Sequence, residues 1–166
     1  MLLRTYRPED LLAVHEINDA AVPAVGAQTP EALASIASES VITIVADVDD
    51  EVAGFCFVLG PGADYGSLNY AWFAERYDDF VYLDRVAIPT AFRRRGIGRA
   101  MYAEVERLAL ENCPSATTFL LEVNLVPRND PSLAFHDELG FVEVGQRTGG
   151  DDKVVSMMAK PLRRAT

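Results

Sequence analysis

Apolar and polar residues recur along this chain with two periods, one typical of strands and the other of helices. Strands are predicted where short apolar or β-branched runs stand between turn residues. These runs are Leu2–Tyr6, Val41–Val48, Val52–Leu59, Phe80–Ile88, Thr117–Val123, Phe141–Gln146 and Val154–Ala159. The acidic turn Asp49-Asp50-Glu51 joins the second and third runs, which are therefore expected to form a hairpin.

Helices are predicted between these strands. Start or stop signals mark Arg7–Ala20, Thr29–Glu39, Ile97–Glu111 and Asp130–Leu139, and a shorter helix is expected around Tyr70–Arg76. Within the third helix, Ile97, Met101, Val105 and Leu108 recur at spacings of four, four and three residues, which places them on one face. Because helices and strands are interleaved, we expect one α/β (α+β) domain over residues 1–166. Its single mixed sheet should have about seven strands, with helices on both faces.

Composition limits the classes of partner. The net charge of −10 predicts a surface that repels nucleic acid and attracts cations such as amines. No apolar run approaches the roughly 20 residues that span a bilayer, and the first residues turn polar too soon for a secretion signal. Cys56 and Cys113 give neither metal-ligand nor disulfide spacing. We expect a cytoplasmic protein without nucleic-acid, membrane or metal partners, and a homodimer stays open.

A basic segment, Arg93–Arg99, contrasts with this acidic background. It follows the strand that ends in Val86–Ile88, and Gly96 and Gly98 flank the first residue of the next helix, Ile97. Backbone N–H groups at a helix start lack internal partners, and the helix dipole favours an anion there. Glycines let the backbone approach a ligand, and arginines donate charge-assisted hydrogen bonds to phosphate oxygens. The physical interpretation is a pyrophosphate site.

Other interpretations of this segment compete. A Gly-x-Gly pattern alone is weak, and the arginines are also compatible with an ordinary helix start exposed to solvent. A dinucleotide site needs a third glycine where Met101 stands and a tighter turn than Pro89–Arg95 gives, although Glu122 lies at a suitable distance for a ribose. A P-loop is excluded because no Gly-Lys-Ser/Thr follows.

Two motifs, in this order, resemble those of a known family. Arg93-x-x-Gly96-x-Gly98 is similar to the acyl-CoA signature Q/R-x-x-G-x-G/A of the GNAT (Gcn5-related) N-acetyltransferases. Downstream, Asn129-x-x-Ser132-x-x-Phe135-His136-x-x-x-Gly140-Phe141 resembles the family's N-x-x-A-x-x-L/F-Y-x-x-x-G-F. The resemblance is close over about Phe80–Phe141 and elsewhere extends only to the order of elements. It implies a mainly antiparallel sheet and transfer of an acetyl group from acetyl-CoA to a primary amine in a ternary complex, with CoA as product.

The resemblance also implies roles for residues at the cofactor. The strand Val86–Ile88 would pair with the pantetheine arm, the Arg93–Arg99 loop would hold the pyrophosphate, Asn129 would reach the pantetheine and Phe135 would line the wall. The residues expected at the cofactor are Val86, Ala87, Ile88, Arg93, Arg94, Arg95, Gly96, Ile97, Gly98, Arg99, Asn129, Ser132, Phe135 and His136.

Amide formation needs a base for the amine and benefits from an acid for the thiolate. Glu122, at the end of an apolar strand and in the position where the family often has glutamate, is the favoured base. Asp84 is the second candidate, with a salt bridge to Arg85 as its alternative role. His136 is the candidate acid because it shares a helix face with Ser132, although the family usually has tyrosine there.

The acceptor side is predicted from the helical N-terminal region. Asn18, Asp19, Val22 and Pro23, opposite the aromatic loop Tyr65–Tyr77, would form an acidic and aromatic pocket that suits an ammonium group. The aromatic residues are equally compatible with covering the core. The alternative function is a non-catalytic acyl-CoA-binding module that senses or regulates.

Overall fold

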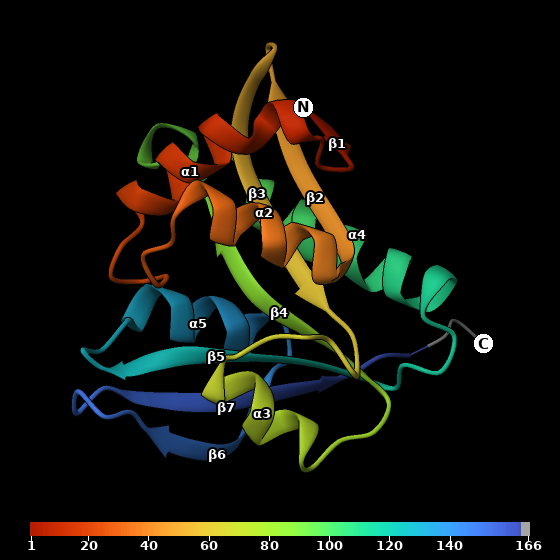
Figure 1. Cartoon of the computed structure of the whole chain (residues 1–166), viewed down its shortest axis with the longest axis vertical. Coiled ribbons are helices and arrows are strands. Elements are labelled where there is room, and N and C mark those ends of the chain that lie inside the picture. The colour runs from red at the N-terminus through yellow and green to blue at the C-terminus, as the bar shows by residue number, and fades with distance from the viewer. Residues whose placement is uncertain (164–166) are drawn as a thin grey trace.

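The predicted hairpin is present in the computed structural model, which describes residues 1–163 (Figure 1). It consists of β2 (Ser40–Val48) and β3 (Glu51–Leu59), which pair antiparallel. Asp49 and Asp50 connect them with φ of 53° and 64°. Positive φ at both central residues of a two-residue turn matches the twist of the flanking strands, and aspartate tolerates this conformation.

The hairpin belongs to a sheet with the order β1-β2-β3-β4-β5-β7-β6. The other strands are β1 (Leu2–Arg4), β4 (Phe80–Ala87), β5 (Thr118–Val126), β6 (Val142–Thr148) and β7 (Val154–Pro161). Among residues 1–163, β4 and β5 form the one parallel pair, and all other neighbours are antiparallel. The seven strands of this region therefore confirm the predicted mixed, mainly antiparallel sheet.

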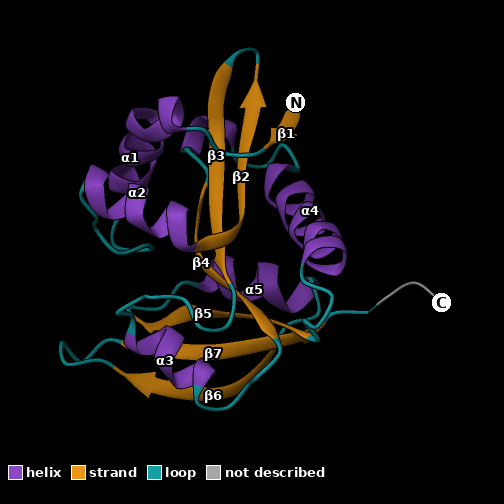
Figure 2. Ribbon diagram, turned by 45° about the vertical axis from the view of Figure 1, so that its right-hand side comes forward, coloured by secondary structure: helices purple, strands orange, loops and turns teal. Residues whose placement is uncertain are grey.

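Helices cover both faces of the sheet, as predicted (Figure 2). The helices α1 (Leu11–Ala20) and α2 (Pro30–Glu39) pack on one face of β2 and β3, and α4 (Ile97–Asn112) packs on the other. Beside the second half of the sheet, α3 (Leu68–Ala74) and α5 (Asp130–Glu138) take opposite faces. Two 3-10 turns, Pro8–Asp10 and Thr90–Phe92, precede α1 and α4.

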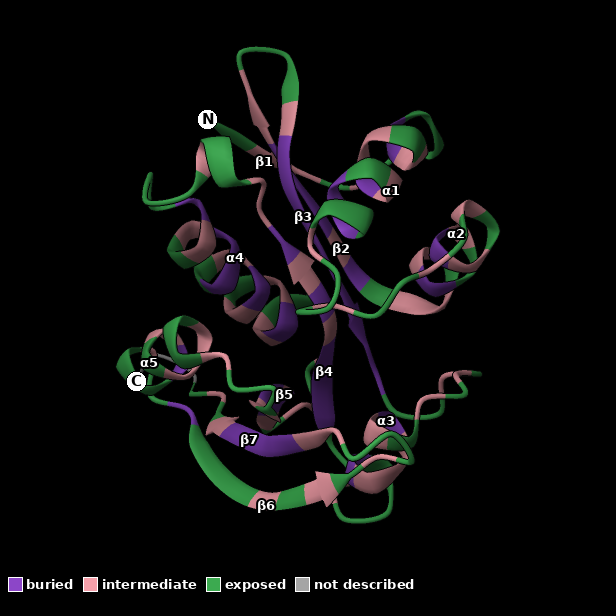
Figure 3. Ribbon diagram, turned by 90° about the vertical axis from the view of Figure 1, so that its left-hand side faces the viewer, coloured by how far each residue is buried: buried purple, intermediate pink, exposed green. Residues whose placement is uncertain are grey.

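The central strands are apolar on both faces because both faces are covered. In β4, Val81 and Leu83 point into the core beneath α4, whereas Phe80 and Tyr82 point into the core beneath α3. Figure 3 shows the resulting contrast between the buried β3 and β4 and the exposed edge strand β6. The helical face predicted for Ile97–Glu111 is confirmed, since Ile97 and Met101 are buried against the sheet.

The parallel pair β4 and β5 diverges soon after it forms. The described pairing runs from Phe80 opposite Thr118 to Tyr82 opposite Leu120, and the strands separate from there (Figure 1). On the other side of β4, the register with β3 shifts, so that Asp84 is an extra residue without a partner opposite it. A bulge of this kind bends a strand and increases its twist. The sheet therefore opens at its middle, directly after Tyr82.

Candidate active site

A cavity of about 1270 Å³ occupies the opening between β4 and β5. Its walls come from the loop between α1 and α2, the loop before α3, the second half of β4, the start of α4, β5, α5 and the β6–β7 hairpin. A volume above the usual range of about 300–1,000 Å³ for a small-molecule site suits a long ligand together with a second substrate.

The start of α4 forms an end of this cavity that is suited to an anion. The first hydrogen bond at this end of the helix is donated by Ala100 N to Gly96 O at 3.0 Å. The amides of Ile97, Gly98 and Arg99 therefore precede the hydrogen-bonded ladder and are available to a ligand. These residues line the cavity, with the positive end of the helix dipole behind them.

The two glycines of the motif serve different needs. Gly96 caps the helix with φ of 78°, a left-handed conformation that is strained for residues with a side chain. Gly98 has ordinary φ but little room. A Cβ built there would lie 3.3 Å from Cζ of Phe135 and 3.5 Å from Cδ1 of Ile88. Gly98 thus keeps the gap between α4 and α5 open, and Phe135 lines the cavity at this point.

Three of the four predicted arginines line the cavity, namely Arg93, Arg94 and Arg99. Arg93 donates from Nε to the carbonyl oxygen of Ile88 at 3.0 Å, which ties the loop to the end of β4. Arg99 forms an ion pair with Glu138 of α5. Arg95 is outside the described lining, and its guanidinium lies 5.3 Å from the ring centre of Phe92.

The strand end Val86–Ile88 also lines the cavity. Its neighbour on one side is β3, through Val86 opposite Cys56 and Ala87 opposite Phe55. On the other side, the described pairing with β5 has already ended. The edge of β4 that faces the cavity is therefore able to pair with an extended ligand, as a sheet edge pairs with an added strand.

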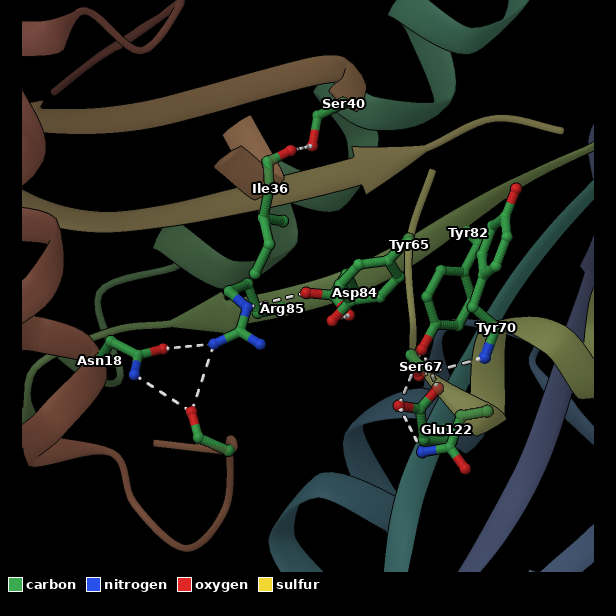
Figure 4. Close-up of polar contacts among 12 residues, drawn as sticks. Asn18, Ile36, Ser40, Tyr65, Ser67, Tyr70, Tyr82, Asp84, Arg85 and Glu122 are labelled. Atoms are coloured by element: carbon green, nitrogen blue, oxygen red, sulfur yellow. Dashed lines mark hydrogen bonds and ion pairs between the residues drawn. The ribbon is translucent and has the colours of Figure 1, made fainter. Parts of the chain in front are cut away.

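Glu122 of β5 lies at the point of divergence, half-buried and facing the cavity. Tyr82 donates from its hydroxyl to this carboxylate (Figure 4). Asn69 donates from Nδ2 to Oε1 at 3.0 Å. Burial raises the pKa of Glu122 to about 7, an effect that the hydrogen bonds from Tyr82 and Asn69 partly oppose and the nearby charge of Asp84 reinforces. A carboxyl with this pKa is suited to accept a proton near neutral pH.

Asp84 takes the alternative role proposed for it. Arg85 donates from Nε to its Oδ2 at 2.8 Å, and the Tyr65 hydroxyl donates to its Oδ1 at 2.5 Å. Arg85 also donates to Oδ1 of Asn18 at 2.8 Å (Figure 4). Both residues donate to the carbonyl oxygen of Gly26. The predicted salt bridge is therefore present within β4, and the other hydrogen bonds of Arg85 link β4 to α1 and to the loop between α1 and α2.

His136 of α5 lies at the cavity wall and is almost fully buried. Its Nδ1 lies 2.7 Å from the carbonyl oxygen of Ser132, and its Nε2 lies 2.7 Å from the Tyr102 hydroxyl. Since a carbonyl only accepts, Nδ1 carries the proton, and a neutral ring accepts at Nε2 from Tyr102. Burial lowers the pKa of His136 below its ordinary value, so its surroundings favour this neutral form.

Asn129 and Ser132, also predicted at the cofactor, line the same stretch of wall. The Asn129 side chain caps α5, since its Oδ1 accepts from Ser132 N at 3.2 Å. This use of Oδ1 directs only one end of the amide, and Nδ2 has no partner within residues 1–163. Asn129 is therefore able to donate from Nδ2 toward the cavity, and its contact with the pantetheine stays a prediction.

The acceptor side differs from its prediction. Asn18 is fully buried beneath Arg85, and Asp19 faces outward beside His15. The connection between α1 and α2 lines the cavity instead through Ala21, Ala24, Val25, Gly26 and Gln28. Of the aromatic loop, Tyr65 reaches the cavity, whereas Tyr70 and Phe73 are buried in the core beneath α3. The predicted acidic and aromatic pocket is therefore wrong in most of its residues.

Sequence reasoning also missed side chains that surround the candidate groups. Asn69, Tyr82 and Arg147 are linked to Glu122, and Tyr102 is linked to His136. The sequence carried no signal for Tyr82, because the register that places it opposite Leu120, two residues before Glu122, comes from the structure. Across residues 1–163, no group of three or more His, Cys, Asp or Glu could hold a metal, and no helix could span a membrane.

The residues that line the cavity fit the chemical groups of coenzyme A. A pyrophosphate requires donors and positive charge, which the amides at the start of α4 and the adjacent arginines supply. A pantetheine arm requires an open strand edge, which the second half of β4 supplies. The gap between α4 and α5 that would receive the arm depends on Gly98 having no side chain.

Comparisons with known proteins agree with this fit. The sequence profile of the acetyltransferase (GNAT) family matches residues 11–141. Ard1 from Thermoplasma volcanium has a similar structure, with a TM-score of 0.81, 19% identity and 98% of each chain covered. The ribosomal-protein-S18-alanine N-acetyltransferase from Escherichia coli gives a TM-score of 0.74 at 20% identity, covering 99% of this chain and 96% of that one. No curated protein sequence matches the chain.

A third similar structure is an aminoglycoside 6'-N-acetyltransferase in complex with coenzyme A, with a TM-score of 0.73 and 16% identity over 100% of this chain and 99% of that one. At such identities the structures establish the fold, which is that of acetyltransferases. The matched profile covers most of the chain. The protein belongs to the acetyltransferase (GNAT) family.

Proposed function

We propose that the protein is an N-acetyltransferase that transfers the acetyl group of acetyl-CoA to a primary amine, by direct attack within a ternary complex. The observation that carries the proposal is Glu122, a carboxyl group with a pKa of about 7 where β4 and β5 diverge. The anion-binding end of the cavity is formed by α4, and Glu122 stands beyond it in the same cavity. The site thus offers both a place for acetyl-CoA and a base for an amine.

Glu122 is proposed as the base. An alkylamine has a pKa near about 10.4 and arrives protonated, so it must lose a proton before it attacks. Ionised Glu122 takes that proton directly or through one water. Asp84 is the weaker candidate, because Tyr65 and Arg85 already occupy its two oxygens. Its proposed role is to hold Arg85, and through Arg85 the loop between α1 and α2.

The backbone at the end of β4 is proposed to bind and polarise the thioester. A backbone N–H near Ile88 would donate to the carbonyl oxygen, where charge develops during attack. Acetyl-CoA supplies an activated acyl group with a good leaving group, since a thiol has a pKa of about 8.5. The proposed cofactor contacts are those expected from the sequence, without Arg95, which lies against Phe92.

The acid role of His136 stays a prediction from the sequence, and the geometry counts against it. Its one proton is committed to the Ser132 carbonyl, and its other nitrogen faces the Tyr102 hydroxyl. To act as an acid, the ring would need a second proton, which burial disfavours. We propose instead that His136 holds Tyr102 in place at the wall. The cytoplasmic location and the absence of nucleic-acid partners also stay predictions.

The test combines cofactor binding with turnover. Acetyl-CoA is expected to raise the melting temperature of the protein, whereas NADH and ATP are not. With a panel of primary amines, CoA release should be detected by a thiol reagent. Glu122→Gln should lower kcat by about 10²–10⁴-fold while the thermal shift with acetyl-CoA persists. Glu111→Gln, a surface exchange of the same type on α4, is the matched control.

The outcomes separate the functions considered. Stabilisation by NADH without stabilisation by acetyl-CoA would revive the dinucleotide site. Binding of acetyl-CoA without CoA release from any amine would identify a non-catalytic module that senses acyl-CoA. Unchanged turnover in Glu122→Gln would remove Glu122 as the base and make Asp84 the next residue to replace.

A further inference from the structure

Arg147 of β6 is a cation inside the cavity that the proposed chemistry does not use. It donates from Nε to Oδ1 of Asn69 at 2.6 Å. Within residues 1–163, its two terminal nitrogens, Nη1 and Nη2, have no hydrogen-bond partner or ion pair. A guanidinium presents its donors as a planar fork that matches a carboxylate in two parallel hydrogen bonds. The fork of Arg147 is therefore held at one nitrogen and free at the other two.

Arg147 is connected to the proposed base through one side chain. Asn69 accepts from Arg147 at its Oδ1 and donates from its Nδ2 to Oε1 of Glu122 at 3.0 Å. The guanidinium and the carboxylate are thus separated by the width of a single carboxamide, and both face the same cavity. The positive charge of Arg147 also lowers the pKa of Glu122, which agrees with their proximity.

A purely structural role accounts for only part of this arrangement. Holding Asn69 requires a single donor, which a neutral side chain such as glutamine also supplies. The guanidinium of Arg147 is half-buried at the cavity, and an anion there would pair with its charge and accept from its two remaining donor nitrogens. The adjacent Asn69 is neutral, and Glu122 is protonated for part of the neutral pH range. An anionic group on the substrate would complete the pairing.

The rest of the cavity wall that the β6–β7 hairpin forms is also mainly positively charged. The hairpin that carries Arg147 also places Lys153 at the cavity, and its ammonium group has no ion pair within the described chain. Asp151 is the one acidic residue that the same hairpin contributes to the described lining. Despite the net charge of −10 for the whole chain, this side of the acceptor region carries more positive than negative groups.

We propose that the acceptor is an amine with a carboxylate on the adjacent carbon, as in a free α-amino acid, and that Arg147 binds this carboxylate while Glu122 takes the proton of the amine. The inference rests on the proposed function, whose site it shares. An amine and a carboxylate on one carbon match two protein groups that are one carboxamide apart. A peptide N-terminus has an amide at the corresponding position and lacks the charge that Arg147 would pair with.

Matched pairs of substrates test this without any mutation. Each of the standard α-amino acids is compared with its primary carboxamide, which keeps the side chain and the amine but removes the negative charge. The kcat/KM for acetylation, measured by CoA release, should favour the acid over the amide by about 10- to 100-fold for the side chains that the site accepts. Equal rates for acid and amide, or a preference for the amide, would overturn the inference.

Variants locate the effect at Arg147. Arg147→Gln keeps a donor for Asn69 but loses the fork, so the acid-to-amide ratio of kcat/KM should fall about tenfold or more, mainly through KM for the acid. The acid-to-amide ratio of Arg147→Lys should lie between those of the wild type and Arg147→Gln, because lysine keeps the charge without the planar fork. Arg107→Gln, on the exposed face of α4, is the matched control and should keep the wild-type ratio. An unchanged ratio in Arg147→Gln would remove Arg147 as the carboxylate site.

Binding measurements separate this inference from the proposed function. Amino acids and their amides are titrated into the CoA-loaded protein by calorimetry. Binding that depends on the carboxylate, without turnover, would sink the catalytic proposal and keep the carboxylate site. Turnover of amines that lack a carboxylate, without binding of any amino acid, would overturn the carboxylate site and keep the catalytic proposal. Neither binding nor turnover of any amine would overturn both.

Discussion

The Tyr82 hydroxyl lies 2.9 Å and 2.8 Å from the two carboxylate oxygens of Glu122. This contact crosses from β4 to β5 where the strands begin to separate, since Tyr82 stands opposite Leu120 in the last described pair. The carboxylate is therefore held by the paired part of the sheet while it faces the open part. A base positioned in this way loses little freedom when a substrate binds.

The pH dependence of turnover should report Glu122. With a pKa of about 7, the carboxyl is protonated at lower pH and cannot accept a proton from the amine. We expect kcat/KM to rise with pH to a midpoint near 7 and then to level off until the amine of the acceptor itself deprotonates. A midpoint near the ordinary carboxyl value of 4.5 would contradict this assignment.

Tyr82→Phe should move this midpoint upward. The hydrogen bond from the tyrosine lowers the pKa of Glu122, so its removal leaves the effect of burial less opposed. Activity at pH 7 should fall and should recover at higher pH, a pattern that general unfolding would not give. Tyr70→Phe is the matched control, because that buried hydroxyl donates to the Gly60 carbonyl and not to Glu122. An acid shift in Tyr82→Phe would show that the hydroxyl acts otherwise.

Local features of the fold were predictable because neighbouring residues encode them. The hairpin at Asp49 and Asp50 and the glycine-capped start of α4 depend on turn residues and glycines within a few positions. Glu122 was expected at the end of an apolar strand beside the divergence of the sheet, and the structure places it there, while its role as base stays a proposal. These elements agree with the structure since local preference and tertiary environment favour the same conformation.

The surroundings of Glu122 were less predictable because they come from distant parts of the chain. Asn69 lies 53 residues before Glu122, and Arg147 reaches Asn69 across 78 residues. Neither belongs to a motif, and only the packing of α3 against the sheet brings them together. The prediction for Asn18 was wrong for the same reason, since the sequence did not show that the buried Arg85 would donate to its side chain. Spacing along the chain carries no information on such contacts.

Glu122→Gln should change stability in a pH-dependent way. Glu122 binds its proton more tightly in the folded state, with a pKa of about 7 against 4.5 in the unfolded chain. Its favourable contribution is complete below pH 4.5 and is lost as the pH rises through 7. Between about pH 5.5 and 8.5, this loss amounts to about 2 kcal/mol.

The measurement is urea unfolding of both proteins at the two ends of this range. The wild type should lose about 2 kcal/mol more than Glu122→Gln as the pH rises, because glutamine does not titrate. The comparison cancels the titration of the other carboxylates, which both proteins share. Parallel pH dependences of the two proteins would mean that Glu122 has an ordinary pKa in the folded state.

Gly98→Ala should weaken cofactor binding without destabilising the fold. The added Cβ would lie 3.3 Å from Phe135 and 3.5 Å from Ile88, which narrows the gap between α4 and α5. Alanine favours a helix over glycine by about 1 kcal/mol, which offsets the tighter contact in the ligand-free protein. The Kd for acetyl-CoA, from calorimetry, should rise about tenfold or more. A Kd like that of the wild type would mean that the cofactor avoids this gap.

His136→Gln decides the acid step. A base with a pKa of about 7 must be ionised, while an imidazolium acid must keep its proton although burial lowers its pKa. These needs oppose each other, so only a small fraction of the enzyme would hold both groups in the required forms. We expect His136→Gln, whose side-chain oxygen is able to accept from Tyr102, to keep kcat within about tenfold of the wild type. A loss of about 10²–10⁴-fold, with acetyl-CoA binding intact, would restore His136 as the acid.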